Sequence, residues 1–369
     1  MKIIYRYIIK EFFPKFFVSL LVFTFILLMD QLFDLTDLLL NKGAGLSDTL
    51  LLFLYILPSL FMFTVPMAIL AGTLLLFCRL NDDNEITAIR TAGISIISVM
   101  KPVLIVSFFL SLIMLYFNST VAPSANHKFK LLYYRILYKN PVMQLAEKSF
   151  VQLQNYDIYV KKITNDNILH NVLIYKWETD LPTITIAETA EMAIAEGGGG
   201  EGGGGRGTFF RLNTGTTLQE NLQKIGDFTL CSFDSNDLIL QTSEKMDFLD
   251  RRESGCRELN SSMLLKKAKT GPAYLKNSYI TEYYLRYAIG WAGIIFVIIA
   301  VPLSLLPKKR AKSFGIAVTV GLIFVYYILL ITSTTLGEKG FMNPIFAVWL
   351  PNFVIGLVGI KLTTSIAKK

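Results

Sequence analysis

Hydrophobic residues are concentrated in two long blocks, at about residues 12–123 and 281–366, and the region between them is polar. Each block divides into three apolar runs that meet or approach the ~20 residues needed to cross the hydrocarbon core of a membrane. The pattern therefore predicts two groups of three transmembrane helices, separated by a domain exposed to water. The predicted spans are Phe16–Leu38, Thr49–Phe77 interrupted by Pro58 and Pro66, Val99–Val121, Tyr283–Leu306, Phe314–Leu336 and Pro344–Leu362.

The middle region, residues 124–280, is typical of β structure. Short runs of β-forming residues recur in it, as in Val172–Tyr175 and Thr183–Ile186, and turn-forming residues separate them. Such spacing favours a sandwich or jelly roll. The expected fold is an α-helical membrane protein with six transmembrane helices and an inserted all-β, jelly-roll-like domain. Its domains would be residues 1–123, 124–280 and 281–369.

A glycine-rich segment interrupts the middle region at residues 196–207, which read EGGGGEGGGGRG. By composition it predicts a flexible tip that joins two strands, or an engineered insertion. It lacks the Lys-Ser/Thr pair with which a phosphate-binding loop contacts phosphates and Mg²⁺.

Charge predicts the orientation. The chain of 369 residues has a mean hydropathy of +0.48 and a formal net charge of +8. The basic residues gather in the loops on one side of the predicted spans, namely Lys2, Arg6, Lys10, Arg79, Arg90, Lys101, Lys308, Lys309, Arg310, Lys312, Lys368 and Lys369. The loops on the other side hold only Lys42 and Lys339. Since basic residues favour the cytoplasmic side, both termini are expected there and the middle domain outside. The pattern does not indicate a nucleic-acid partner, and the first span is too long for a cleavable signal peptide.

The chain offers no chemistry for a metal or a cofactor. Its two histidines, His127 and His170, stand alone, and the three cysteines have no metal-ligand spacing. Cys231 and Cys256 fall in the same predicted domain, where a disulfide is possible, but two separate thiols are favoured. There is no Walker A sequence, so any ATP hydrolysis would belong to another subunit. We expect no catalytic residue and no cofactor.

The loop between the second and third spans predicts a short helix at about residues 82–92. Asp82 or Asp83 would cap its N-terminus, Glu85 would lie in the first turn, and Gly93 would end it. Ile86 and Ile89 lie one turn apart on one face. This segment is either a docking helix for a partner protein, with the two isoleucines exposed, or an interfacial helix on lipid headgroups.

This segment carries a resemblance to a known family. The run Phe77-Cys78-Arg79-Leu80, followed by Glu85 through Ser95 (EITAIRTAGIS), resembles the signature of the LptF/LptG permeases of the lipopolysaccharide-export ABC transporter. Further similarities follow in order along both apolar blocks: Tyr7-Ile8-Ile9-Lys10-Glu11-Phe12, Val301-Pro302-Leu303, Gly315, Val325-Tyr326-Tyr327, Gly337, Gly340, Pro344 and Trp349-Leu350-Pro351-Asn352.

The resemblance implies a set of partners. Two such permeases pair in the bacterial inner membrane, and a cytoplasmic ATPase dimer binds their second-to-third loops. Periplasmic bridge proteins receive the lipopolysaccharide substrate, and the β domain continues into that bridge. The residues expected to couple the chain to the ATPase are Asp83, Glu85, Ile86, Ile89 and Arg90.

The resemblance also implies a substrate cavity between the two permeases, with a lateral gate formed by the fifth span of one and the first span of its partner. Its candidate residues are Asp30, Phe33, Asp34, Lys42, Arg286, Tyr326 and Leu329. Family members often carry basic residues just beyond the first span, whereas this chain has Asp30, Asp34 and Asp37 on one helix face there. These carboxylates either hold a divalent ion or a partner's cation, or simply face water. Lys42 and Arg286 are the nearest basic candidates for lipid phosphates, and the alternative for Arg286 is snorkelling to the headgroups.

The function expected from these features is that of a non-enzymatic permease subunit, which extracts lipopolysaccharide from the inner membrane and passes it to the periplasmic bridge. The alternative is a membrane-anchored assembly or sensor protein whose β domain binds an envelope partner. A secondary transporter is disfavoured, because spans four to six hold almost no ionisable residues for ion coupling.

Overall fold

The computed structural model describes the chain as two compact units. The first, here called the helical unit, comprises Met1–Asp37, Gly45–Lys130 and Ser254–Lys369, and the second, the β unit, comprises Leu38–Ala44 and Leu131–Glu253. The residues described are 2–40, 45–139, 149–153, 156–164, 168–177, 182–195, 207–220, 228–240, 255–305 and 314–367.

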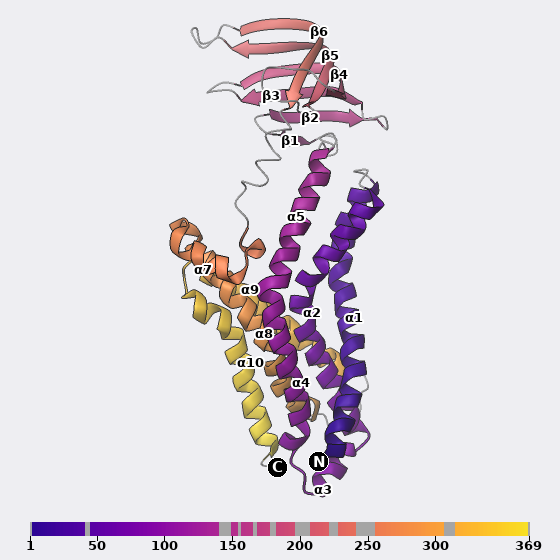
Figure 1. Cartoon of the computed structure of the whole chain (residues 1–369), viewed down its shortest axis with the longest axis vertical. Coiled ribbons are helices and arrows are strands. Elements are labelled where there is room, and N and C mark those ends of the chain that lie inside the picture. Colours follow the sequence, from indigo (N-terminus) through magenta and orange to yellow (C-terminus); the bar gives the residue numbers. More distant parts are fainter. Residues whose placement is uncertain are drawn as a thin grey trace. The chain divides into compact units, whose positions relative to one another are not determined.

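The helices and short turns occupy both ends of the chain (Figure 1). The first group is α1 (Lys2–Leu40), α2 (Leu46–Asp82), α3 (Glu85–Thr91), α4 (Ile96–Tyr116), the π-helical turn η1 (Phe117–Val121) and α5 (Ala122–Lys139). The second group is η3 (Cys256–Glu258), α7 (Ser261–Thr270), η4 (Ala273–Leu275), α8 (Lys276–Leu305), α9 (Phe314–Glu338) and α10 (Pro344–Ala367).

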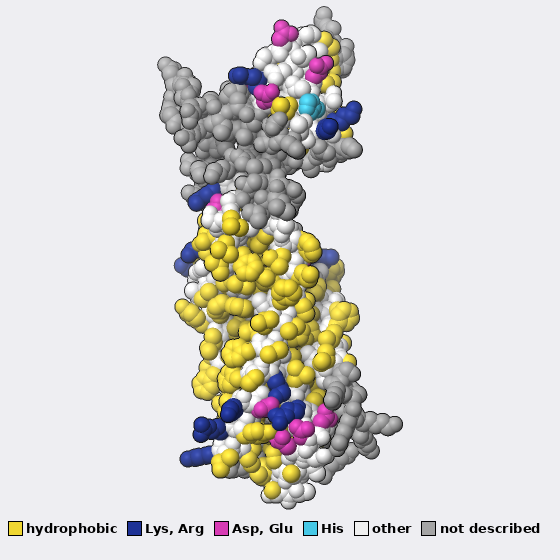
Figure 2. Space-filling view, turned by 90° about the vertical axis from the view of Figure 1, so that its right-hand side faces the viewer, with side chains coloured by type: hydrophobic (Ala, Val, Ile, Leu, Met, Phe, Trp, Pro, Cys, Tyr) yellow, Lys and Arg dark blue, Asp and Glu magenta, His cyan; other side chains and the backbone are white. Residues whose placement is uncertain are grey.

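Six helical stretches in the described residues are long and apolar enough to cross a membrane, which confirms the predicted number. Hydrophobic side chains form a broad band over the helical unit, and charged side chains gather at one end of it (Figure 2). Two expected boundaries differ. Pro58 and Pro66 lie inside a continuous α2, because membrane helices tolerate proline, and the third span continues through η1 into α5.

The helices of this unit are unequally enclosed. In α2 and α8, 67% of the most apolar window is buried, whereas in α1 and α9 the buried share is 22%. The central helix α8 packs against α2, α4, α9 and α10. Most of the apolar surface of α1 and α9 is therefore left without a protein neighbour in a single copy of the chain.

One glycine permits a close approach between α1 and α2. A Cβ placed on Gly72 would lie 3.1 Å from the backbone N and Cα of Phe16 and 3.3 Å from the ring of Phe12. Gly72 therefore lets the aromatic face of α1 rest directly on the backbone of α2.

The described residues of the β unit form six strands in one antiparallel sheet, in the order β1-β2-β3-β4-β5-β6. Their bounds are β1 Phe150–Leu153, β2 Tyr156–Ile163, β3 Leu169–Trp177, β4 Pro182–Ala195, β5 Gly207–Glu220 and β6 Phe228–Leu240. A β domain is thus confirmed, but it is shorter than the expected residues 124–280, because α5 continues to Lys139 and the chain is helical again from Cys256. The described strands form a meander of sequential neighbours, and they are not divided between two sheets as a sandwich would require.

The sheet is interrupted along one line that crosses it. Lys161, Asn171, Glu188, Thr214 and Asp234 would lie side by side, yet the strand pairing skips all five. Asn171 and Thr214 have positive φ angles of 51° and 49°. A break at the same level in five strands bends the sheet across its strands.

The burial pattern agrees with this bend. On β3 the buried positions Leu169 and Val172 are three residues apart, and on β4 Ala187 and Ala190 are spaced likewise, where an unbroken strand would give an even spacing. Residues from both sides of the line share one buried cluster, which comprises Ile158, Val160, Leu169, Val172, Ile174, Ala187, Ala190, Phe210 and Leu212. The bend therefore gives a single sheet a common core.

The glycine-rich segment was expected to join two strands. Residues 196–206 lie outside the described residues, but β4 and β5 on either side of them are paired, with Ala195 opposite Gly207. The segment therefore connects two neighbouring antiparallel strands.

Candidate coupling site at α3

The helix predicted in the second-to-third loop is present as α3. It lies at the same end of the helical unit as both chain termini (Figure 1). Its N-cap is Asn84, in the left-handed region with φ 58°, and no side chain caps it, so the predicted caps Asp82 and Asp83 are wrong. Those two residues end α2, because that helix continues past the apolar span. At the other end Gly93 has φ 82°, which confirms the glycine stop.

The two isoleucines of α3 face the protein. Ile86 is buried at 4% exposure and Ile89 is partly buried against the same cluster, so the expectation of an exposed apolar pair is wrong. The reason is that α3 folds back onto the end of α2, where Phe77 and Leu80 are fully buried. The exposed surface of α3 consists of Thr87, Ala88, Arg90 and Thr91.

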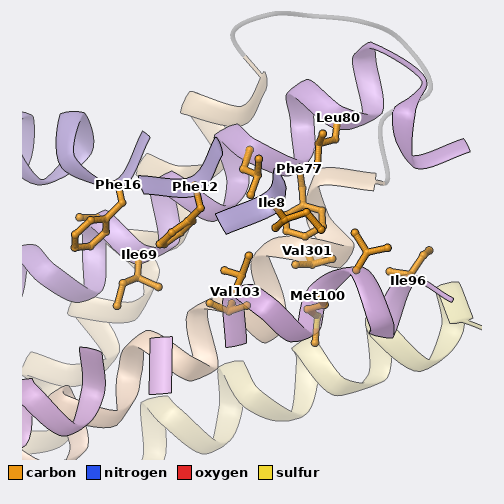
Figure 3. Packing of buried hydrophobic residues seen from close by; sticks show 14 of the residues in the cluster. Ile8, Phe12, Phe16, Ile69, Phe77, Leu80, Ile96, Met100, Val103 and Val301 are labelled. Atoms are coloured by element: carbon orange, nitrogen blue, oxygen red, sulfur yellow. The ribbon is translucent and has the colours of Figure 1, made fainter. Parts of the chain in front are cut away.

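The cluster under α3 joins several helices (Figure 3). Ile8, Phe12 and Phe16 enter it from α1 at intervals of four residues, which places them on one face of that helix. They meet residues of α2, α4 and α8, among them Phe77, Ile69, Met100, Val103 and Val301. α3 is thus seated on a common core, to which α1 contributes one aromatic stripe.

Glu85, at the start of α3, is bonded to α1. The hydroxyl of Tyr7 donates to both carboxylate oxygens, at 2.9 Å to Oε2 and 3.1 Å to Oε1. Arg79, near the end of α2, adds its guanidinium at 3.7 Å from Glu85 Oε1. One carboxylate therefore meets groups from two other helices.

Arg79 extends this network. It pairs with Glu11 of α1 and, through Nε at 3.1 Å, with Asp83 in the turn before α3. Glu11 also pairs with Lys15 one turn further along α1. An isolated exposed pair contributes little, but a network of several charges has a fixed geometry and contributes more. We refer to Tyr7, Glu11, Arg79, Asp83 and Glu85 together as the α1–α3 polar cluster.

The sequence reasoning missed part of this cluster. Glu85 and Asp83 were predicted as coupling residues, whereas Tyr7 and Glu11 appeared only within the similarity motifs and Arg79 was otherwise used only to predict the orientation. A partner 78 residues away leaves no local pattern, although Tyr7 and Glu11 do stand four residues apart on one helix face. Arg90, which was also selected, is exposed and has no ion pair among the described residues.

Two of the predicted cavity residues lie inside the helical unit. Arg286 is 2% exposed, and its guanidinium donates to the Leu259 carbonyl at 2.7 Å, the Cys256 carbonyl at 3.1 Å and Glu282 Oε1 at 3.2 Å. All three nitrogens are thus occupied, because the chain returning from the β unit passes directly over them. The structure does not favour Arg286 as a ligand for lipid phosphates.

Tyr326 is likewise buried. Its hydroxyl donates to Asn352 Oδ1 at 3.0 Å, and its ring packs edge-on against Phe296 with centroids 4.7 Å apart. Asn352 in turn donates to the Ala288 carbonyl at 2.8 Å. Tyr326 therefore joins α9 to α8 and α10 and does not line the uncovered face of α9.

The remaining cavity candidates lie at the surface or outside the residues that the structure describes. Asp30 and Phe33 are exposed on α1, Phe33 at 71%, and Leu329 is half-buried on α9. The side chain of Asp34 and the whole of Lys42 lie outside the described residues. The candidates whose side chains the structure describes, Asp30, Phe33 and Leu329, thus lie at the surface of two different helices.

A second polar cluster ties together the two segments that connect the helical unit with residues 131–253. Glu258 accepts hydrogen bonds from Lys130, from the Gly255 N–H at 3.1 Å and from His127 Nδ1 across 3.4 Å. Burial acts to raise the pKa of Glu258, but these donors outweigh burial, so its pKa lies below the ordinary value. Glu258 is thus held as a carboxylate at neutral pH.

Comparison with protein families matches residues 6–365 of the chain to the family described as lipopolysaccharide export system permease LptF/LptG. The matched range covers the six described strands and all six apolar helices, apart from the first residues of α1 and the last of α10. Comparison with curated proteins gave no match.

Proposed function

This chain belongs to the LptF/LptG family of lipopolysaccharide export permeases, and we propose that it acts as the non-catalytic transmembrane subunit through which a separate ATPase drives lipid extraction. Membership gives the general role, a membrane permease of lipopolysaccharide export. The proposal adds where the ATPase binds and how its motion reaches the lipid path.

The observation that carries the proposal is the bond between Tyr7 and Glu85. A helix that only rests on lipid needs no tie to α1, whereas a helix that transmits force does. The α1–α3 polar cluster links α3 to both α1 and the end of α2, so a displacement of α3 by a bound ATPase would be passed to α1. The ATPase would contact the exposed surface of α3, at Thr87, Ala88, Arg90 and Thr91.

In this proposal Glu85 has a different role from the one first expected. Its carboxylate is directed at Tyr7 and Arg79, so it positions α3 and is not itself the main contact with the ATPase. Asp83 does the same through Arg79. Ile86 and Ile89 seat the helix on the core.

The uncovered surfaces of α1 and α9 support pairing with a second permease. Both helices are mostly exposed in a single copy, and both carry large apolar side chains there, such as Phe25 on α1 and Phe324 on α9. We propose that lipopolysaccharide passes between these helices, with Asp30, Phe33 and Leu329 along the path and Lys42 as the candidate for its phosphates. Orientation follows the basic residues, with both termini and α3 in the cytoplasm and the β unit in the periplasm, where it passes lipid to the bridge proteins.

Co-purification of a cytoplasmic ATPase with the tagged chain tests the proposal. Glu85→Lys places a cation against Arg79 and should reduce the recovered ATPase about tenfold or more, since a charge-assisted contact contributes about 1.5–3 kcal/mol. Glu338→Lys, an exposed charge reversal at the end of α9, is the matched control and should leave recovery unchanged. Equal ATPase recovery from the two variants would remove Glu85 from the mechanism.

A further inference from the structure

The helix α7 is basic, lies at the outer end of α8 and has no role in the proposed export mechanism. It occupies the end of the helical unit away from both termini (Figure 1). Residues 259–281 include Lys266, Lys267, Lys269 and Lys276 and no acidic residue. None of these four lysines forms an ion pair with any residue that the structure describes. The segment therefore carries four positive charges without an internal counter-charge.

α7 is also amphipathic. Leu264 is fully buried and packs with Leu259 and Tyr279 in a small cluster of its own. Met263 and Leu265 flank that buried residue and are 53% and 39% exposed. At helical spacing these two residues border the exposed cationic face from its two sides. Cationic and apolar side chains exposed together on one helix are typical of a helix that lies in the plane of a membrane surface.

Aromatic residues indicate at which depth of the membrane α7 lies. Tyr274, in the turn after α7, is 79% exposed, and Tyr283, Tyr284 and Tyr287 follow in the first half of α8, each partly exposed. Tyrosine is enriched where a membrane protein crosses from hydrocarbon to headgroups. α7 therefore stands at the level of the lipid headgroups, next to the start of the apolar part of α8.

We propose that α7 and the turn after it lie in the headgroup layer and bind the phosphates of anionic bilayer lipids. Lys266, Lys267, Lys269 and Lys276 contact the phosphates, while Met263 enters the boundary with the acyl chains. The occupant is the lipid surface itself. A protein partner would need a continuous apolar patch, and the two exposed apolar residues of α7 lie on either side of the buried Leu264.

Such binding holds the outer end of α8 at a fixed depth. The same end carries Arg286 and Glu282, which hold the segment returning from the β unit. The inference does not depend on the proposed export function, and the experiment below measures lipid contact without transport.

The test uses the full-length chain with a fluorescent amino acid at Met263, reconstituted in mixed vesicles of phosphatidylcholine and phosphatidylglycerol. Either the anionic or the zwitterionic lipid carries bromine in its acyl chains, which quenches fluorescence on contact. Both should quench, with a clear excess from brominated phosphatidylglycerol, and high salt should reduce that excess.

The variant K266Q/K267Q/K269Q/K276Q should lower the excess about threefold or more while quenching by brominated phosphatidylcholine remains. The matched control, K161Q/K162Q, removes two exposed lysines of β2 and should change nothing. The double variant K266Q/K269Q should lose an intermediate part of the excess quenching, and it replaces the quadruple variant if that variant does not fold. Equal quenching by the two lipids in the unmodified chain, or no quenching by either because a protein covers α7, would overturn the proposal.

Discussion

The hydroxyl of Tyr7 in α1 donates hydrogen bonds to both carboxylate oxygens of Glu85 in α3, across 78 residues of sequence. α1 is mostly uncovered along its apolar length, so its attachment at this end depends on few contacts. The Tyr7–Glu85 bond is one of them, and the packing of Phe12 and Phe16 on α2 is another.

Tyr7→Phe should therefore weaken ATPase association although Tyr7 is not on the exposed surface of α3. The substitution keeps the ring and removes only the hydroxyl, at a cost of about 1 kcal/mol, or about fivefold in affinity. Titration of the purified ATPase against the detergent-solubilised chain measures the change. Tyr5→Phe is the control, since the Tyr5 hydroxyl bonds to no other described residue, and an equal effect of the two variants would contradict the role of the bond.

A side chain at position 72 should loosen α1. Gly72→Val places its side chain against the Phe16 backbone at a distance where backbone must move, and overpacking of this kind costs about 1–3 kcal/mol. The loss should be seen as a lower midpoint of thermal unfolding in detergent. Gly321→Val on α9, where nothing lies within 4 Å of the added carbon, is the matched control and should not lower the midpoint.

Acid should destabilise the chain through Glu258. Its folded-state pKa is lowered, so the stabilisation is complete above the unfolded value of about 4.5 and is lost as pH falls through the folded value. Between pH 7 and pH 3.5 the unfolding midpoint of the wild type should fall more steeply than that of Glu258→Gln. The two profiles should converge at the acid end, and Glu188→Gln, an exposed carboxylate on β4, should follow the wild type. Parallel profiles for wild type and Glu258→Gln would show that the bonds to Lys130 and Gly255 do not favour the ionised form.

The glycine-rich connection should be replaceable. Ala195 and Gly207 lie opposite each other, so Asn-Gly in place of residues 196–206 makes a two-residue hairpin turn of favoured type. Loop-closure entropy varies only slowly with length, so expression and export should be unchanged within about 1 kcal/mol of stability. Loss of export with normal folding would show that residues 196–206 contact a partner.

The substrate path should include the exposed end of α1 and the part of α9 around Leu329. Photoreactive groups at Phe33 and Leu329 should cross-link lipopolysaccharide, whereas one at Leu357, 67% exposed on α10, should cross-link it poorly. Lys42→Glu should impair export more than Lys42→Ala, because a like charge repels the lipid phosphates. Equal cross-linking at all three positions would indicate general lipid contact, and full export by Lys42→Glu would place the headgroup site elsewhere.

The sequence predicted those features that depend on length and local chemistry. Apolar runs long enough to cross a membrane gave the six spans, and Gly93 marked the end of α3 because few other residues adopt a positive φ. Periodicity placed Ile86 and Ile89 on one face of α3 but could not tell whether that face met solvent, a partner or the protein itself. That depends on where α2 ends and folds back, which is a tertiary property.

Other features could not be predicted from the sequence, because they too depend on the tertiary structure. Arg286 is a plausible phosphate ligand by sequence, but its position beneath the Cys256 and Leu259 carbonyls depends on the return path of a segment 27–30 residues earlier. The bend of the sheet depends on the alignment of Asn171 and Thr214 in two different strands, and neither position signals a bend alone.

The central claim is that a cytoplasmic ATPase binds the exposed face of α3. Photo-cross-linking from single positions in the assembled complex tests it most directly, with a photoreactive group at Thr87 and a control group at Lys339, which is exposed after α9. The account predicts a covalent adduct with the ATPase from position 87, a weaker one when Tyr7→Phe is added, and none from position 339. No adduct from position 87, or equal adducts from both positions, would contradict it.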